Sequence, residues 1–212
     1  MIKALLLIFD PLATWEGIAR ARRGIGFILV VYLLPILIIT SAGEGYGLVR
    51  WGRERGRVSE VGHVENFSTN QAVIFEAGQF VLSLLVVFVG ASMVKSIGET
   101  FHGRHTYQQS FTAVAYGLGP LILLRLLDAL PMVNPWVSWS IGIILTVAVL
   151  YQGLPRMMEP DPSHALGLFF MTALLLILLT GLLRFLTFWY LIGRFGPVDV
   201  FVSHLAERLP FK

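Results

Sequence analysis

Charged residues within hydrophobic stretches are the first candidates for chemistry in this sequence. Arg125 and Asp128 stand three residues apart in the stretch 111–131, so a helix would place both on one face, where they can pair. At ~1.5 Å per residue, Arg125 would lie ~21 Å from the start of that helix, nearer the far membrane surface than the midplane. We therefore predict a surface-reaching pair. The alternative is a buried pair that bridges to another helix through Glu76 or Arg184.

Glu76 and Arg184 are the other ionisable residues in such stretches. Glu76 falls in the first turns of its stretch, where the helix dipole favours a carboxylate and water is close. Arg184 follows the uncharged part of the last stretch, and the aromatic residues Phe185, Phe188 and Trp189 beside it indicate a membrane surface. We predict that Arg184 extends to the lipid headgroups, with a carboxylate partner as the alternative.

A polar loop contains the only spacing that suggests metal binding. Glu99, His102 and His105 are three residues apart, and carboxylate and imidazole groups can bind zinc. The loop has no HExxH motif, and Gly103 loosens its geometry, so we expect no metal and no cofactor there. The sequence also contains no G-x-S-x-G motif and no P-loop, and we predict that the protein is not an enzyme.

The composition indicates the elements that must position these residues. Of 212 residues, 56% are hydrophobic and 14% are charged, and the mean hydropathy is +0.74. Soluble domains carry ~25% charged residues, so this is a polytopic membrane protein. The net charge of +3 is spread over loops and does not predict nucleic-acid binding.

The hydrophobic pattern predicts an all-α fold, a five-helix transmembrane bundle with short amphipathic interfacial helices at both ends. Asp10-Pro11 and Asn134-Pro135 are typical helix starts, and capping boxes begin at Ser68 and Thr106. Trp15 is expected at the headgroups, and residues 43–70 are expected to form a hydrophilic loop. The predicted segments are an N-terminal interfacial segment 1–23, a membrane domain 24–193 with spans at about 24–42, 71–94, 107–127, 135–154 and 165–192, and an amphipathic tail 194–212.

The third span contains a helix-breaking sequence. Pro120 has no N–H, so the carbonyl of Tyr116 loses its helical partner, while Gly117 and Gly119 allow close approach of another helix. We interpret this as a kinked helix packed at the centre of the bundle. The alternative is a broken helix whose free carbonyl lines a transport site.

Charge predicts the orientation only through the first span. The two sides receive seven Lys and Arg residues each, but Arg20, Arg22 and Arg23 immediately precede the first span. Because the first span usually dominates, we expect a cytoplasmic N-terminus.

The order of features resembles the Yip1 domain family over about residues 8–190. The similarity rests on DPLATWEGI, FHGRHTYQQSF, AYGLGP, LLDALP and YQGLPRMME, and on the positions of Tyr116, Gly117, Gly119, Pro120, Pro131 and Gly153. It implies a five-helix membrane domain, and eukaryotic members bind Rab-type GTPases. This chain has only 23 residues before its first span and lacks their Asp-Leu-x-Gly-Pro element, so we do not expect a small GTPase partner. It is more similar to the compact prokaryotic members, which implies the prokaryotic cytoplasmic membrane.

We therefore predict a membrane protein that acts by association, through membrane lipids and other membrane proteins or itself, without catalysis. The alternative function is a small transporter or channel-like carrier that uses the break at residues 116–120. No nucleic-acid partner is expected.

Overall fold

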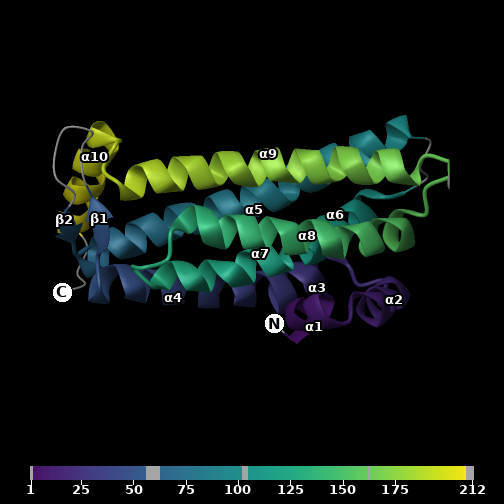
Figure 1. Ribbon diagram of the computed structural model, residues 1–212, viewed down its shortest axis with the longest axis horizontal. Coiled ribbons are helices and arrows are strands. Elements are labelled where there is room, and N and C mark those ends of the chain that lie inside the picture. The colour runs from purple at the N-terminus through teal and green to yellow at the C-terminus, as the bar shows by residue number, and fades with distance from the viewer. Residues whose placement is uncertain (1, 56–62, 102–104, 162, 209–212) are drawn as a thin grey trace.

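The computed structural model describes residues 2–55, 63–101, 105–161 and 163–208. In these residues, five helical segments are long and apolar enough to cross a membrane. They run side by side along the longest axis of the molecule (Figure 1). The protein is an all-α membrane bundle, as the hydrophobic pattern predicted.

Each span contains more than the ~20 residues that a bilayer requires. The first comprises α3 (Ile25–Ile28), the π-helical turn η1 (Leu29–Leu33) and α4 (Leu34–Arg50), and the third comprises α6 (Tyr107–Gly117), α7 (Gly119–Leu124) and the 3₁₀ turn η2 (Arg125–Ala129). The second, fourth and fifth are the single helices α5 (Thr69–Thr100), α8 (Pro135–Met158) and α9 (Ala165–Leu191).

The third span lies at the centre of the bundle. In its most apolar window 72% of the residues are buried, against 28–44% in the other four spans. Ala113, Val114 and Ala115 are fully buried, and their small or branched side chains let neighbouring helices approach. This span can therefore place side chains against several other helices at once.

The predicted helix starts are confirmed by the caps. The Ser68 hydroxyl accepts from the Gln71 N–H at 3.2 Å, and the Gln71 side chain accepts from the Ser68 N–H at 3.0 Å. Thr106 and Gln109 form the same reciprocal box. Asn134 caps α8 through the N–H of Trp136, at 2.9 Å. These bonds satisfy N–H groups that lack helical partners.

The first span continues beyond the predicted start of the hydrophilic loop. α4 ends at Arg50, so residues 43–50 are helical, and Glu44 is buried with 1% of its surface exposed. Gly43 and Gly47 lie one turn apart against Leu126 and Ala129 of the third span, where a Cβ atom would collide with them. The loop prediction failed because a charged residue was taken as the end of the membrane helix.

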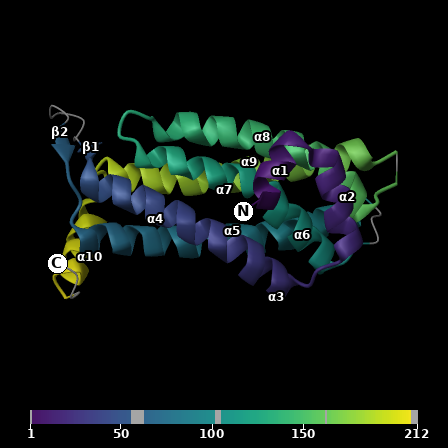
Figure 2. The same ribbon diagram turned by 90° about the horizontal axis from the view of Figure 1, so that it is seen from below.

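Two short helices precede the first span, where one interfacial helix was expected. α1 (Ile2–Phe9) and α2 (Pro11–Ala21) lie across the bundle rather than along it (Figure 2). Trp15 is fully buried, and its indole Nε1 donates to the carbonyl oxygen of Val149 in α8 at 3.0 Å. The Trp15 ring therefore packs inside the protein and does not face the lipid, because Gly153 leaves room for it against α8.

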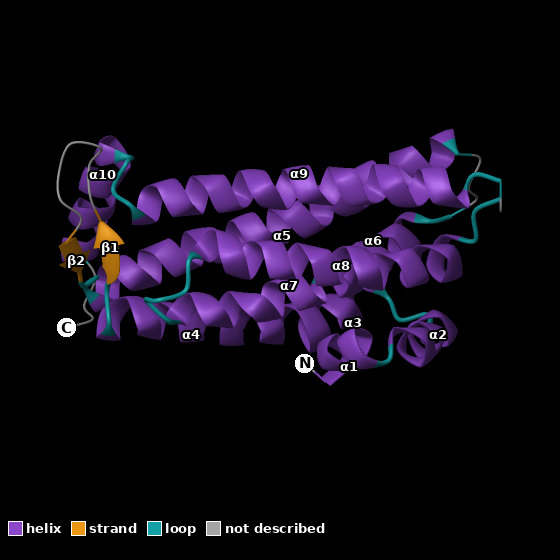
Figure 3. Ribbon diagram, in the orientation of Figure 1, coloured by secondary structure: helices purple, strands orange, loops and turns teal. Residues whose placement is uncertain are grey.

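The opposite end of the bundle carries the C-terminal helix and a small hairpin (Figure 3). Strands β1 (Arg53–Arg55) and β2 (His63–Glu65) pair antiparallel, and α10 (Gly196–Glu207) lies across the span ends. The amide of Asn70 donates to the carbonyl oxygen of Ala206 at 2.7 Å, and Val202 is buried beside it. Phe201 remains 62% exposed, so α10 keeps an apolar surface for the membrane interface.

Candidate functional site

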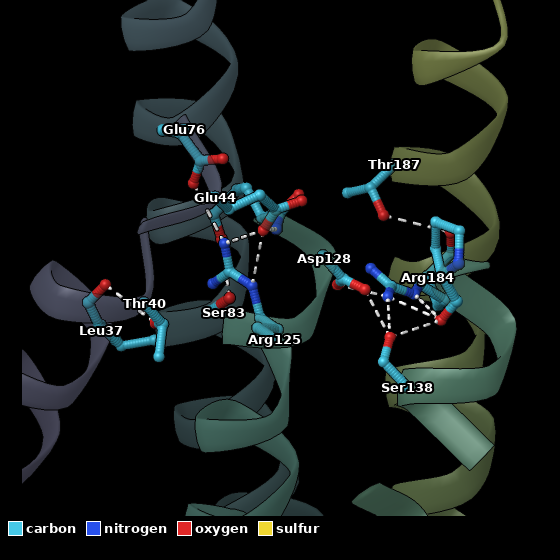
Figure 4. Close-up of polar contacts among 12 residues, drawn as sticks. Leu37, Thr40, Glu44, Glu76, Ser83, Arg125, Asp128, Ser138, Arg184 and Thr187 are labelled. Atoms are coloured by element: carbon cyan, nitrogen blue, oxygen red, sulfur yellow. Dashed lines mark hydrogen bonds and ion pairs between the residues drawn. The ribbon is translucent and has the colours of Figure 1, made fainter. Parts of the chain in front are cut away.

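Arg125 and Asp128 lie in η2, the tight last turn of the third span, and their side chains reach different helices (Figure 4). Arg125 turns toward α4 and α5, whereas Asp128 turns toward α8 and α9. The ion pair predicted between them is replaced by three pairs with other helices: Arg125 pairs with Glu44 and Glu76, and Asp128 pairs with Arg184. The favoured surface-reaching pair was therefore wrong, and the alternative of bridging pairs is the one observed.

Glu44, Glu76, Gln79 and Arg125 form what we call the Arg125 cluster. The Arg125 guanidinium donates to Glu44 Oε2 through Nε at 3.2 Å and through Nη2 at 2.9 Å. The same Nη2 lies 3.1 Å from Glu76 Oε2, and Gln79 Nε2 donates to Glu44 Oε2 at 2.9 Å. One guanidinium thus faces two buried carboxylates, which leaves an excess of acidic groups.

Asp128, Ser138 and Arg184, with the carbonyl of Pro135, form what we call the Arg184 cluster. Arg184 Nη2 donates to Asp128 Oδ2 and, at 2.9 Å, to the Ser138 hydroxyl. Arg184 Nε donates to the Pro135 carbonyl oxygen at 2.9 Å, and the Ser138 hydroxyl donates to Asp128 Oδ1. Here one guanidinium faces one carboxylate. The short connection from η2 to α8 brings Asp128 and Ser138 together.

The prediction that Arg184 extends to the headgroups is wrong. Only 6% of its surface is exposed, and its donors are taken up by Asp128, Ser138 and the Pro135 carbonyl. A buried guanidinium cannot lose its proton, so it requires such acceptors. The side chain turns inward, although aromatic residues follow it in the sequence.

Glu44, Gln79 and Ser138 were not identified as site residues from the sequence. Glu44 was assigned to a loop, although Gly43-x-x-x-Gly47 around it is the small-xxx-small spacing of a closely packed helix. Applied to these glycines, that rule would have extended the first span and brought Glu44 into the bundle. No sequence signal singles out Gln79 or Ser138.

A cavity of about 60 Å³ separates the two clusters. Gln79 and Arg125 line it from one side and Ser138 and Arg184 from the other, with apolar side chains between them. A water molecule needs about 10–15 Å³ by this measure, so the cavity has room for a few waters. A separate groove of about 370 Å³ between α4 and α5 reaches Glu76. The Arg125 cluster is therefore placed between two spaces, and its additional carboxylate could hold a proton or a cation.

The family-motif residues of the third and fourth spans form a packed centre beside α1 and α2. The centroid of the Tyr116 ring lies 4.2 Å from the centroid of the Tyr32 ring. It lies 6.4 Å from the centroid of the Trp15 ring, which it meets edge to face. A Cβ on Gly119 would collide with the Tyr32 hydroxyl, and one on Gly153 would collide with Trp15. Other motif positions behave differently: Gly117 packs on Leu150, Pro120 is buried at the start of α7, and Pro131 is exposed in the turn before α8.

The loop residues considered for metal binding do not come together where they are described. Glu99 is paired with Lys95 at 3.2 Å, and His102 lies outside the described residues. His105 is buried against Gly98, and burial lowers the pKa of its imidazole. Within the described part of the chain, no three His, Asp or Glu side chains are grouped as metal ligands.

Comparison with known families gives one match. The model of the Yip1 domain matches residues 5–185, which is nearly the whole chain and includes both clusters. No curated protein and no solved structure matches the chain.

Proposed function

Because the chain belongs to the Yip1 domain family, we propose that it works as a non-catalytic membrane protein that acts by association. Its partners in this proposal are membrane lipids and other membrane proteins or a second copy of itself. Neither nucleic acid nor a small GTPase is among them. The single observation that carries the proposal is the close packing of other helices against Gly117 and Gly119, at the break in the third span.

The packing is closest at the two glycines of the break, while Leu118 between them borders the cavity. Tyr32 and Ala4 fill the space beside Gly119, Leu150 fills the space beside Gly117, and the Tyr116 ring is only 2% exposed. The connecting residue Leu118 keeps right-handed helical geometry, with φ −76° and ψ −6°. A kinked but filled helix of this kind supports a rigid scaffold rather than an open passage.

The buried acids also support a role without catalysis. Glu44, Glu76 and Asp128 each accept from an arginine inside the bundle. An acid or base catalyst must reach a proton on a substrate, and these groups are already engaged with positive charge. Both clusters therefore link helices, and only the Arg125 cluster has a carboxylate in addition to a matched pair.

Cysteine labelling tests the proposal, because the native sequence contains no thiol. Ser83→Cys and Thr180→Cys place a thiol on the cavity wall, and Met132→Cys places one at a 97% exposed turn. We expect membrane-impermeant maleimide to label Met132→Cys and to leave both cavity variants unlabelled from either side. Labelling of a cavity variant at the rate of the turn variant would overturn the association proposal.

A second candidate function, a small carrier, is favoured by one observation. The Arg125 cluster, with its additional carboxylate, lies between the cavity and the groove that reaches Glu76. Leu118, Leu121, Ile122 and Arg125 of the third span line this space, so it extends from the break at residues 116–120, where the sequence suggested a transport site, to the Arg125 cluster. In a carrier, the cavity variants would be labelled from one side, and adding the transported ion would slow the labelling.

Co-purification gives the positive test of association. The chain would be isolated from native membranes and the accompanying lipids and proteins identified by mass spectrometry. We expect particular lipids or membrane proteins to accompany it in a constant ratio through successive detergent washes. Loss of every companion at the first wash would contradict the proposal.

We further propose a prokaryotic cytoplasmic membrane with the N-terminus in the cytoplasm. The five spans place the turn at Met132 on the side opposite α2, and Ser163 on the same side as α2. In intact cells, impermeant maleimide should label Met132→Cys and should reach Ser163→Cys only after permeabilisation. The reverse pattern would show the opposite orientation.

A further inference from the structure

A basic pocket lies at the end of the bundle where the first span begins. It has a volume of about 310 Å³, within the range of small-molecule sites, and is lined by residues of α2, α6 and α8. Among its polar lining residues are Arg22, Arg23, Thr106, Gln108, Gln109 and Arg156. We refer to these six residues as the basic pocket. It is distinct from the Arg125 and Arg184 clusters, with which it shares no lining residue.

The charge of the pocket is strongly positive. Three arginines line it against one carboxylate, Glu159. Among the described residues, no ion pair joins any of these arginines to a carboxylate, whereas Arg20 on the same helix is paired with Glu16 at 3.1 Å. Arg156 Nη1 donates to the Gln152 carbonyl oxygen at 2.6 Å and Arg23 lies over the Phe27 ring, but no carboxylate of the described chain neutralises these positive charges.

The backbone holds two of the lining residues in an unfavourable conformation. Arg22 and Glu159 are the non-glycine residues with positive φ in the described chain, both at 41°, and both line this pocket. Arg22 ends α2 and Glu159 ends α8, at positions where glycine is the usual residue because it lacks the Cβ that makes this conformation costly. Such backbone conformations concentrate at functional sites.

A helix N-terminus completes the pocket. α6, with 11 residues, begins at Tyr107, and Thr106, Gln108 and Gln109 around its start line the pocket. The dipole at such a start favours a negative charge, although the Thr106–Gln109 box already takes up the N–H groups of these two residues. The Gln108 amide donates to the carbonyl oxygen of Arg23 at 3.0 Å, which fixes the arginine-bearing segment beside α6.

We infer that the basic pocket binds the phosphate group of an anionic phospholipid. Planar guanidinium groups match the geometry of phosphate oxygens, and basic pockets between membrane helices are suited to lipid headgroups. The Phe27 ring, 42% exposed, lies 4.7 Å from the Arg23 guanidinium, so acyl chains would find an apolar side chain next to the pocket. The inference deepens the proposed association function and rests on it for the choice of a lipid rather than a soluble partner.

Native mass spectrometry of the intact protein in detergent micelles tests the assignment. The probes are dioleoyl phosphatidylglycerol, the zwitterionic dioleoyl phosphatidylcholine, and inorganic phosphate alone. We expect phosphatidylglycerol to bind at least about tenfold more tightly than phosphatidylcholine, which would be consistent with charge-assisted bonds to the pocket. Inorganic phosphate that binds as tightly as phosphatidylglycerol would overturn the assignment to a lipid.

Arg22→Gly is the decisive variant because it separates binding from folding. Glycine removes the guanidinium and also relieves the positive-φ conformation, so the thermal midpoint should not fall. Combined with Arg156→Gln, it should weaken phosphatidylglycerol binding at least about tenfold. Unchanged phosphatidylglycerol binding by this double variant would overturn the inference.

Arg20→Gln is the matched control. It removes one positive charge from the same helix, but this charge is already paired with Glu16 outside the pocket. We expect it to bind phosphatidylglycerol as the unmodified protein does. An equal loss in Arg20→Gln and in the double variant would show only a general surface-charge effect and would overturn the site. These results are independent of the cavity labelling, so the inference and the proposed function can fail separately.

Discussion

Arg184 and Arg125 are both held inside the bundle, but Arg184 faces one carboxylate and Arg125 faces two. Arg184 also binds the Ser138 hydroxyl and the Pro135 carbonyl, so its donors and acceptors are matched. Gln79 also donates to Glu44, but the Arg125 cluster still has two carboxylates for one guanidinium. This cluster borders both the cavity and the groove.

This difference separates a structural link from a site that can change its charge. A matched pair in hydrocarbon holds helices together and has no reason to exchange protons. An additional carboxylate beside a space for water can exchange one. The four predictions that follow test this distinction, from the largest expected effect to the smallest.

Removing Asp128 should have the largest effect. Asp128→Ala leaves the Arg184 guanidinium buried without its carboxylate, and arginine cannot neutralise itself by losing a proton. We expect a loss of about 3–5 kcal/mol in the free energy of unfolding. Thermal or denaturant unfolding in detergent micelles measures it.

Glu16→Gln is the control for Asp128→Ala, since it breaks the exposed pair with Arg20. It should cost less than about 1 kcal/mol. A loss in Asp128→Ala no larger than in this control would show that the Arg184 cluster does not link the helices.

Replacing Arg125 should cost less, although it leaves two carboxylates without their partner. In Arg125→Leu, Glu44 and Glu76 can take up protons, and Gln79 still donates to Glu44. We expect the free energy of unfolding to fall by about 1–3 kcal/mol. This is the cost of burying incompletely satisfied polar groups rather than a fixed charge. A loss equal to or greater than that of Asp128→Ala would remove the distinction between the clusters.

Glu76→Gln should change stability by less than about 1 kcal/mol, because its side-chain carbonyl can still accept from Arg125 while the additional acidic group is removed. Glu44→Gln is the matched comparison. It should cost more, because Glu44 accepts three of the bonds in the cluster. Equal effects of the two substitutions would show that the carboxylates are equivalent.

The smallest expected effect is a pH effect outside the membrane spans. Burial lowers the pKa of His105, so the unfolded chain takes up this proton first, near the ordinary value of 6.5. The stability contributed by neutral His105 is therefore complete above about pH 6.5 and is lost as the pH falls below it.

His105→Phe should flatten the pH dependence of the unfolding midpoint between pH 7.5 and pH 5.5. The midpoint would be measured at intervals of ~0.5 pH unit. This variant provides the baseline against which titration of the Arg125 cluster can be measured. An unchanged slope would assign the pH dependence to other groups.

The spans and their starts could be predicted from the sequence because they depend on local properties. Hydropathy identifies a helix that crosses the bilayer, and Ser68 and Thr106 cap helices through residues three positions away. Fold class and family followed from the same local patterns.

The candidate site could not be predicted to the same extent, because its contacts are distant in the chain. Glu44 and Arg125 are 81 positions apart, and Asp128 and Arg184 are 56 apart. A charge near a span end can extend outward or turn inward, and only the positions of the other helices decide between them. The spacing of Arg125 and Asp128 suggested one ion pair between them, whereas helix packing gives Arg125 two carboxylate partners and Asp128 an arginine partner from another helix.

The contact between Trp15 and Val149 has a consequence for biogenesis, because it joins positions 134 residues apart. α2 leaves the ribosome long before the helix that receives it has been made. The Trp15 ring therefore cannot reach its final contact until α8 has been synthesised and inserted. The segments synthesised first are among the last to reach their final place.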